Sequence, residues 1–432
     1  MTTEAQLKGK KPNDSVTVNG HGTHLNPDDA NAYYDRGCAK IELGKFDQAI
    51  ADLDEAIRLN PDDAYSYNCR GVANSNLGRN AEAIADFDTA IRLNPDYVDA
   101  YANRGLEKTD VGQYAEAIAD YDEAIRLSPK DADTYVRRGI AKGELGCYDE
   151  AIVDYDKAVR LNPGETHVAT VYLLRASTKC VLGKHYQAIT DYDEAIRLKP
   201  DDANLHRCRG YAKLHLAKHE DAISDYDKAI RLDPNGAEAY HERGIAKSKL
   251  DGFGAAIADF DEAIRLDGAS PQVFYNRGVV KSELDRYEEA IADYDEAIRM
   301  NPDYADAYSN RGFAKAALGN YEEAIADYDE AIRLKPDDAK TYTNRAIAET
   351  GLELYDSAIL DYDEAIRMNP SFANAYLCRG ILRLVLGGKE RAKKDCQTAL
   401  KLAQNANDKT VETEAQLALD NLESGMPLHQ IH

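Results

Sequence analysis

Long apolar runs are missing from this chain. Among its 432 residues, no apolar run approaches the roughly 20 residues that a membrane-spanning helix needs. The opening residues, MTTEAQLKGKKPNDS, also lack the apolar core of a secretory signal. We therefore expect a cytoplasmic protein with no direct membrane insertion.

Paired cysteines and a basic excess are missing as well. The seven cysteines stand singly and form no CxxC motif, which favours free thiols in a reducing compartment. Lys and Arg number 53 against 77 Asp and Glu, which gives a net charge of −24. Such a charge repels nucleic acid and anionic membranes and attracts basic groups. We expect a protein or peptide partner, with basic segments favoured, and no nucleic acid.

What the chain has in abundance is one repeated pattern. Prolines recur in steps of 34 residues, with one step of 37, at Pro61, Pro95, Pro129, Pro163, Pro200 and Pro234, and again at Pro302, Pro336 and Pro370. An arginine keeps the same register at Arg36, Arg70, Arg104, Arg138, Arg175, Arg209, Arg243, Arg277, Arg311, Arg345 and Arg379, and nine of these eleven precede a glycine. The chain therefore contains eleven repeats, with a three-residue insertion near 164–170.

The segment VDAYANRGLEKTDVGQYAEAIADYDEAIRLSP, residues 98–129, represents one repeat. Apolar and small residues at helical spacing lie on both sides of a turn near Gly112, and Pro129 ends the second helix. Small residues such as Gly105 allow the two helices to approach, and Tyr121 fills the space beside them. One such helix pair cannot bury its apolar faces alone, so the repeats are predicted to stack.

The repeat length, the small and aromatic positions and the terminal proline resemble the tetratricopeptide repeat over about residues 28–404. Two positions depart from the usual pattern of this family. Arg104 stands where the family normally has an apolar residue, and Lys108 stands where it often has an aromatic residue. This Arg-Gly form of the repeat is common in bacteria. The resemblance implies an all-α fold, an α-solenoid in which about eleven helix-turn-helix units form a right-handed superhelix. It also implies that the first helix of each pair lines a concave groove.

The ends of the chain depart from the repeat. Residues 1–27 are polar and aperiodic, and we expect them to be disordered. Residues 405–432 are expected to hold an amphipathic capping helix at 409–423 and a tail, because a terminal repeat needs its exposed face covered. The array itself is assigned to residues 28–404.

Every repeat carries an arginine in its first helix and an aspartate in its second, such as Arg104 with Asp120 and Arg311 with Asp327. One interpretation is a ligand-binding row of charges, and the other is an internal bridge between the helices. Because binding residues should vary between repeats while scaffold residues should not, we favour the structural bridge. A second aspartate, Asp122, stands four residues before Arg126 and is expected to pair with it along the helix.

Asparagine recurs just before the repeated arginine, at Asn276, Asn310 and Asn344 in consecutive repeats and at Asn103 earlier. A side-chain amide both donates and accepts hydrogen bonds, which suits the backbone of an extended peptide. Similar asparagine rows in this family, including in the O-GlcNAc transferases, bind peptide backbones. Apolar residues recur two positions after the arginine and, with Tyr275, are candidates for an apolar floor beside the row: Val279, Phe313, Ile347 and Ile381. Tolerated polar residues and ordinary repeat packing would explain the two patterns equally well.

Catalytic and metal-binding motifs are missing. There is no phosphate-binding glycine loop, nucleophile elbow or zincin motif, and about 60 residues outside the repeats are too few for a catalytic domain. A metal site is conceivable at Cys180, His206, Cys208, His215, His219 and His241. His215 and His219 straddle a predicted turn, however, so packing or surface roles are favoured. We expect no enzyme, cofactor or metal.

The predicted function is a scaffold that binds a partner peptide or protein segment in its groove. The lysine that binding of chaperone tails requires, two positions before the arginine, is absent from all eleven repeats. The alternative function is a self-associating structural protein whose exposed terminal repeats stack into oligomers.

Overall fold

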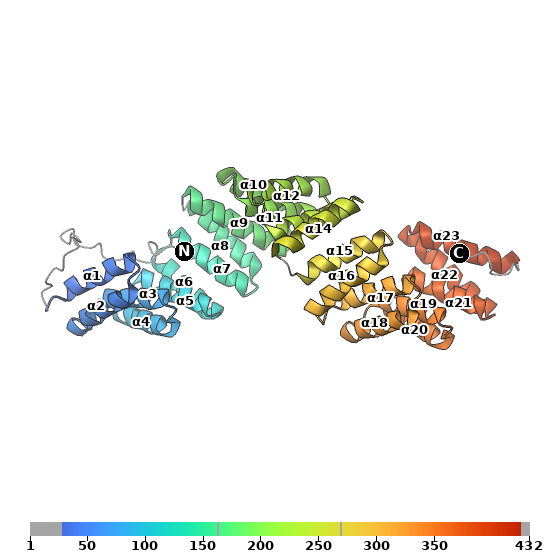
Figure 1. The fold of residues 1–432 in the computed structure, drawn as a ribbon. Coiled ribbons are helices and arrows are strands. Elements are labelled where there is room, and N and C mark those ends of the chain that lie inside the picture. Colours follow the sequence, from blue (N-terminus) through green and yellow to red (C-terminus); the bar gives the residue numbers. More distant parts are fainter. Residues whose placement is uncertain (1–27, 162–163, 268–269, 425–432) are drawn as a thin grey trace. The chain divides into compact units, whose positions relative to one another are not determined.

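The computed structural model describes residues 28–161, 164–267 and 270–424, and these form helices and turns without a strand. The chain forms two compact units, and the boundary between them falls between Lys218 and His219. Figure 1 follows the helices within each unit in chain order, from α1 to α23. None of the helices in the described ranges is long and apolar enough to cross a membrane.

The described part of the first unit contains α1 (Ala30–Glu42), α2 (Phe46–Leu59), α3 (Ala64–Asn76), α4 (Asn80–Leu93), α5 (Val98–Asp110), α6 (Tyr114–Leu127), α7 (Ala132–Glu144), α8 (Tyr148–Leu161), α9 (Glu165–Val181), α10 (His185–Leu198) and α11 (Ala203–Leu214). The described part of the second unit contains α12 (His219–Leu232), α13 (Ala237–Ser248), α14 (Phe253–Asp267), α15 (Pro271–Glu283), α16 (Tyr287–Met300), α17 (Ala305–Ala317), α18 (Tyr321–Leu334), α19 (Ala339–Gly351), α20 (Tyr355–Met368), α21 (Ala373–Val385), α22 (Lys389–Ala406) and α23 (Lys409–Ser424). The prediction of an all-α solenoid is confirmed.

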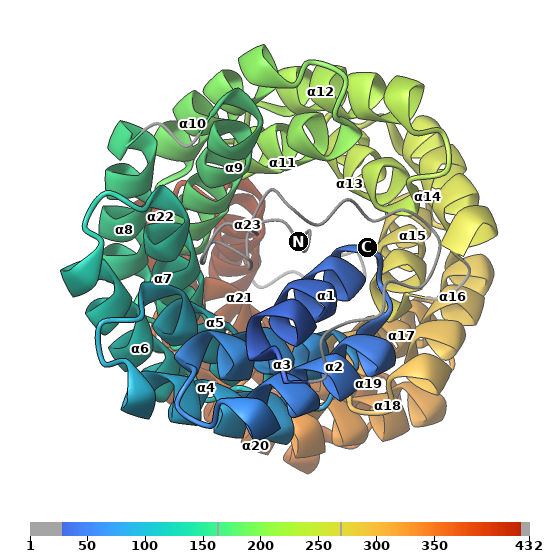
Figure 2. The ribbon, with the colours of Figure 1, turned by 90° about the vertical axis from the view of Figure 1, so that its left-hand side faces the viewer.

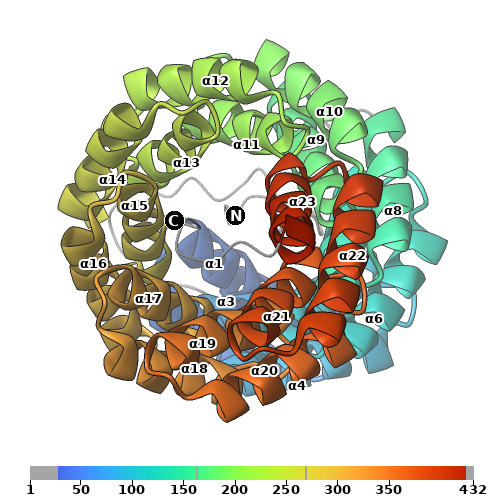
Figure 3. The ribbon, with the colours of Figure 1, turned by 90° about the vertical axis from the view of Figure 1, so that its right-hand side faces the viewer.

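Within each unit, an odd-numbered first helix packs against the even-numbered second helix that follows it. Within each unit, first helices of neighbouring repeats contact one another, as α5 contacts α7 and α17 contacts α19. In the described ranges, no such contact joins the second helices of neighbouring repeats of one unit. First helices therefore lie on the inner side of each unit and second helices on the outer side, as Figure 2 shows for α9 and α11 and Figure 3 for α15, α17 and α19.

The glycine after the repeated arginine allows close packing, although Ala176 and Ala346 take its place in two repeats. A Cβ atom on Gly105 would lie 2.8 Å from Cε1 of Tyr121, a ring that is completely buried. The same approach joins Gly312 to Tyr328 in the second unit. The helices of a pair meet through this contact of a glycine with an aromatic ring, which accounts for the recurring Arg-Gly pair.

The turn between paired helices needs one residue with a left-handed backbone conformation, that is, with positive φ. Glycine fills this place in seven repeats, as at Gly112 and Gly319, with positive φ. Ala217, Asp251, Asp285 and Glu353 adopt the same conformation in the other four repeats. An L-residue is strained there, so these four turns cost stability that the glycine turns do not.

The insertion and the ends of the array also have definite places. The three extra residues near 164–170 coincide with α9, which has 17 residues where most first helices have 13. Helix α23 packs against α21 and α22 and buries Val411, Ala415 and Ala418. Residues 1–27 and the tail from 425 lie outside the described residues.

Candidate partner-binding surface

The repeated arginine is held by two aspartates from two different helices. Arg311 on α17 donates through Nε and Nη2 to Asp327 of α18, at 2.9 Å and 2.5 Å. Its Nη1 donates to Asp295 of α16, the second helix of the preceding repeat, at 2.5 Å. Although burial lowers the pKa of Arg311, its hydrogen bonds to Asp327 raise that pKa above its usual value. One side chain thus joins the helices of its own repeat and also joins two repeats.

This double bridge runs through both units. The bridge within a repeat also joins Arg36–Asp52, Arg70–Asp86, Arg104–Asp120, Arg138–Asp154, Arg175–Asp191, Arg243–Asp259, Arg277–Asp293, Arg345–Asp361 and Arg379–Asp395. The bridge to the preceding repeat also joins Arg70–Asp54, Arg104–Asp88, Arg138–Asp122, Arg175–Asp156, Arg209–Asp193, Arg243–Asp227, Arg277–Asp261, Arg345–Asp329 and Arg379–Asp363. The charges of these arginines and aspartates are therefore paired with one another within the array.

The expected pair of Asp122 with Arg126 is wrong. Asp122 accepts a hydrogen bond from Arg138 of the next repeat, at 2.5 Å. Arg126 instead donates to Glu123, three residues before it on the same exposed face, at 2.8 Å. Stacking brings the fork-shaped guanidinium of the next repeat to Asp122, and a partly buried guanidinium binds a carboxylate more strongly than an exposed side chain does.

Two further contacts complete the surroundings of the arginine. The guanidinium carbon of Arg311 lies 5.3 Å from the centre of the Tyr308 ring, one turn earlier on α17. The Lys315 ammonium lies 3.0 Å from Asp327, so that aspartate receives two cations. Lys108, where the usual pattern often has an aromatic residue, plays the same part for Asp120, at 2.8 Å. Asp327 and Asp120 are therefore each compensated by two cations despite their burial.

The asparagine row is tied into the contacts between repeats. Asn310 Nδ2 donates to the Tyr275 hydroxyl of the preceding repeat, at 3.0 Å. Asn276 Nδ2 lies 2.9 Å from His241 Nε2, and buried Asn103 donates to Asn68 at 3.2 Å. Each of these amides bonds a residue 35 positions earlier in the chain, so part of its hydrogen-bonding capacity serves repeat stacking.

Asn344 differs from the other members of the row. It is half-buried on α19, and its amide has no hydrogen-bond partner within the described ranges of the chain. The residue 35 positions earlier is Ser309, whose hydroxyl bonds Thr341 instead, at 3.0 Å. Within the described ranges, the donors and the acceptor of the Asn344 amide are therefore not used in repeat stacking.

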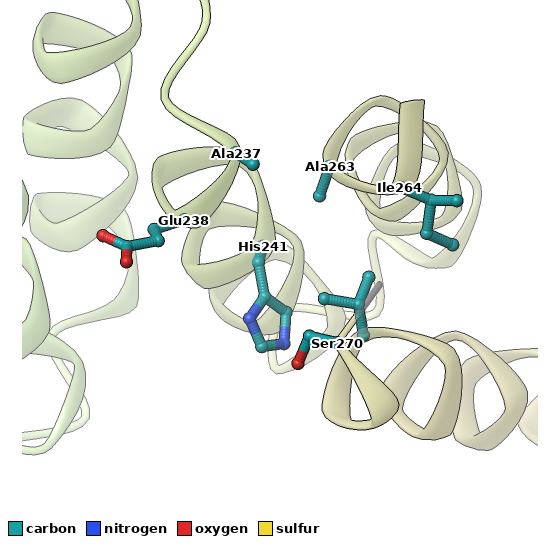
Figure 4. A pocket seen from close by; sticks show the side chains of 7 residues that line it. Ala237, Glu238, His241, Ala263, Ile264 and Ser270 are labelled. Atoms are coloured by element: carbon teal, nitrogen blue, oxygen red, sulfur yellow. The ribbon is translucent and has the colours of Figure 1, made fainter. Parts of the chain in front are cut away.

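A small cavity lies beside His241, the residue that contacts Asn276. It encloses about 180 Å³ and is lined by Ala237, Glu238, His241, Ala263, Ile264, Ser270 and Val273. In Figure 4 the His241 ring and the Ser270 hydroxyl point toward one another, while Glu238 points away. Burial lowers the pKa of His241, so the ring that bonds Asn276 is neutral. The cavity can hold one small side chain.

Apolar side chains reach solvent on the first helices α17 and α19. Phe313 on α17 and Ile347 on α19 are 47% and 42% exposed. Both stand two residues after the repeated arginine, in consecutive repeats. The corresponding residues of the first two repeats, Cys38 and Val72, are buried. An apolar surface at this place thus distinguishes the second unit from the beginning of the first.

Tyr275 plays a different part from Phe313. Its ring is half-buried and packs against Tyr304, with the ring centres 4.9 Å apart. Its hydroxyl accepts the hydrogen bond from Asn310. Tyr275 therefore supports the row of asparagines through its hydroxyl, and its part in an apolar floor stays a prediction.

The histidines near the sixth repeat do not converge on one point. The His185 and His215 rings stack with their centres 4.9 Å apart, and His206 Nε2 bonds the Pro200 carbonyl oxygen at 2.9 Å. Across the described ranges, no three His, Cys, Asp or Glu side chains are grouped to hold a metal ion. Parallel stacking does not direct two ring nitrogens toward a shared ion.

Protein-family models match the repeats directly. A model described as "TPR repeat" matches residues 105–146, 180–216, 218–251 and 281–319. Two models described as "Tetratricopeptide repeat" match residues 34–98 and 70–106, and residues 132–165 and 305–338. Together these matches cover more than half of the chain. A model described as "Anaphase-promoting complex subunit 5" matches residues 350–424.

Several solved structures are similar at low identity. Yeast Tom70 is 18% identical with a TM-score of 0.40, over 92% of this chain and 96% of that one. The APC/C hetero-tetramer Cut9-Hcn1 is 15% identical with a TM-score of 0.48, over 91% and 90%. A tetratricopeptide repeat protein from Parabacteroides merdae is 20% identical with a TM-score of 0.44, over 58% and 98%. A comparison with curated proteins finds no match.

Proposed function

We propose, since this chain belongs to the tetratricopeptide-repeat family, that it is a protein-interaction scaffold whose second unit binds an extended segment of a partner protein. The segment lies across the first helices α17 and α19. The observation that carries this proposal is the exposure of Phe313 and Ile347 in consecutive repeats, together with the Asn344 amide, which has no partner among the described residues. Two large apolar side chains and one side-chain amide offer both contact area and a bond to a peptide backbone.

The spacing of the repeats suggests the form of the bound segment. Packed helices lie about 8–10 Å apart. A polyproline-type chain rises about 9 Å over three residues, so every third side chain faces the same way. We expect apolar side chains at every third residue of the partner segment, each in contact with one repeat.

Charge favours a basic partner. The net charge of −24 attracts basic segments over long range, and salt screens this attraction. Binding should therefore slow and weaken as ionic strength rises. The apolar contacts to Phe313 and Ile347 should remain at high salt.

Affinity capture with mass spectrometry tests the proposed surface. Serine at both Phe313 and Ile347 should lower partner capture about tenfold or more, because burying each such side chain contributes about 1.5–3 kcal/mol. The matched control is Leu360→Ser on α20, since Leu360 is 68% exposed on a second helix. Capture should also fall with Asn344→Ala and with alanine at Asn276, Asn310 and Asn344 together. Equal capture by the double-serine variant and the wild type would exclude this surface.

Open stacking into oligomers is less well supported. Gln397 stands in the last repeat where the ten others carry the aspartate that binds the next arginine. A further copy would therefore find no carboxylate for its Arg36. Helix α23 also covers the last repeat. Size-exclusion chromatography with light scattering distinguishes the two functions, because a scaffold stays monomeric at all concentrations while a stacking protein grows in mass.

A further inference from the structure

Four residues after each repeated arginine, ten of the eleven repeats carry a hydrogen-bond donor. Within the two units this donor bonds the aspartate that the arginine of its own repeat also bonds, in the pairs Lys40–Asp52, Asn74–Asp86, Lys108–Asp120, Lys142–Asp154, Lys179–Asp191, Lys247–Asp259, Lys281–Asp293, Lys315–Asp327 and Arg383–Asp395. This second donor holds the first helix of a repeat against its own second helix.

The tenth repeat carries Glu349 at this place. The residue is only 9% exposed, and its Oε2 atom is buried without a partner in the described part of the chain. Asp361 and Tyr362 face it from α20, Asp329 faces it from α18, and Arg345 is the nearest cation on its own helix. Arg345 already bonds both aspartates. Three carboxyl groups thus share one guanidinium.

Protonation of Glu349 would remove this surplus of negative charge. A protonated carboxyl group can donate to Asp361 as lysine does in the other repeats. An ionised Glu349 can only accept, and it repels Asp361 inside a poorly solvated site.

We propose that Glu349 is a proton-binding site that controls the docking of α19 on α20: protonated, it replaces the missing lysine as donor to Asp361, and ionised, it loosens the tenth repeat. Burial, and then the charges of Asp361 and Asp329, raise the pKa of Glu349 to about 7, while Arg345 opposes them. The group therefore changes charge near neutral pH.

The sign of the pH effect follows from proton linkage. The folded tenth repeat keeps a proton on Glu349 up to about pH 7, whereas the unfolded chain releases it near 4.5. Between these values the folded state binds more protons, so its stability falls as pH rises. The stability from this proton is fully present below 4.5 and is lost once pH passes about 7.

Hydrogen exchange of the α19 and α20 amides, corrected for the intrinsic effect of pH, tests the proposal. In the full-length wild type, the opening equilibrium of the tenth repeat should rise by up to about tenfold per pH unit across this window. Glu349→Gln and Glu349→Lys should remove that rise, and the lysine variant should be the most protected at neutral pH. Lys315→Glu should transfer the same pH dependence to α17 and α18 in the ninth repeat.

Two outcomes would overturn the proposal. One is a wild-type exchange profile that superimposes on that of Glu349→Gln at every pH. The other is a carboxyl carbon resonance, absent from the Glu349→Gln spectrum, that titrates near the usual value of 4.5. The resonance decides the proposal even if Lys315→Glu fails to fold.

Discussion

Separating the two bridges of Arg311 gives a direct measure of what holds the array together. The perturbations are Arg311→Met, Asp327→Asn and Asp295→Asn, alone and in pairs. Asp327 is 6% exposed and belongs to the same repeat as Arg311, whereas Asp295 is 56% exposed and belongs to the preceding repeat. Both aspartates lie 2.5 Å from the guanidinium, but Asp327 is more buried and accepts two of its hydrogen bonds where Asp295 accepts one.

Burial should make the bridge of Arg311 to Asp327, within one repeat, stronger than its bridge to Asp295 of the preceding repeat. Two unit charges about 4 Å apart attract by roughly 4 kcal/mol at the effective dielectric of a protein surface and by roughly 1 kcal/mol in water. After desolvation, we expect a coupling of about 2 kcal/mol between Arg311 and Asp327. For Arg311 and Asp295 we expect less than about 1 kcal/mol.

The single variants should differ as well. Arg311→Met leaves Asp327 with Lys315 as a partner, so it should cost about 2 kcal/mol. Asp327→Asn leaves two cations against a neutral amide, so it should cost about 3 kcal/mol.

Two double-mutant cycles provide the measurement, each with stability taken from hydrogen exchange of the α17 and α18 amides. The control is Arg333→Met, since Arg333 is 62% exposed and, among the described residues, bonds Glu330 on its own helix. A coupling between Arg311 and Asp295 that equals or exceeds that between Arg311 and Asp327 would refute the reasoning from burial.

Two further predictions concern the turn and the end of the array. Glu353→Gly should raise the free energy of unfolding by about 1 kcal/mol, because Glu353 has a φ of 59° that strains an L-residue; Gly319→Ala should lower it similarly, and equal thermal midpoints for both variants would contradict this. Leu377→Ala should cost about 3 kcal/mol, because Leu377 is completely buried in the core that joins α21 to α22 and α23; exchange protection should fall in those three helices first, and unchanged protection there would show that they are held otherwise.

The fold was predictable because the pattern occurs eleven times. One helical pattern such as 98–129 is open to error, but a register shared by eleven arginines is not accidental. The contact of Gly105 with Tyr121 also follows from the sequence, since the small and large residues fall at facing positions. Local rules sufficed wherever both partners belong to the same helix pair.

The contacts between repeats were not predictable in the same way. The spacing of Asp122 and Arg126 suggests a pair on one helix, but the partner of Asp122 comes from the next repeat. Likewise, nothing in the local sequence indicates that the Tyr275 hydroxyl accepts a hydrogen bond from the amide of Asn310, 35 residues away. Such pairs depend on how neighbouring repeats stack. One signal was readable, because Gln397 breaks the row of second aspartates in the last repeat, where no next arginine follows.

The double bridge of each arginine has a consequence for how such a chain can lengthen over evolution. Each of the first ten repeats supplies one arginine and two aspartates, one for itself and one for its successor. Copying or deleting a whole repeat therefore leaves every inherited charge with a partner. A change of a few residues between repeats is also tolerated, since Arg175 still reaches Asp156 across the three-residue insertion. Gene duplication in whole steps of 34 residues can thus alter the reach of the protein without a new solution to its electrostatics.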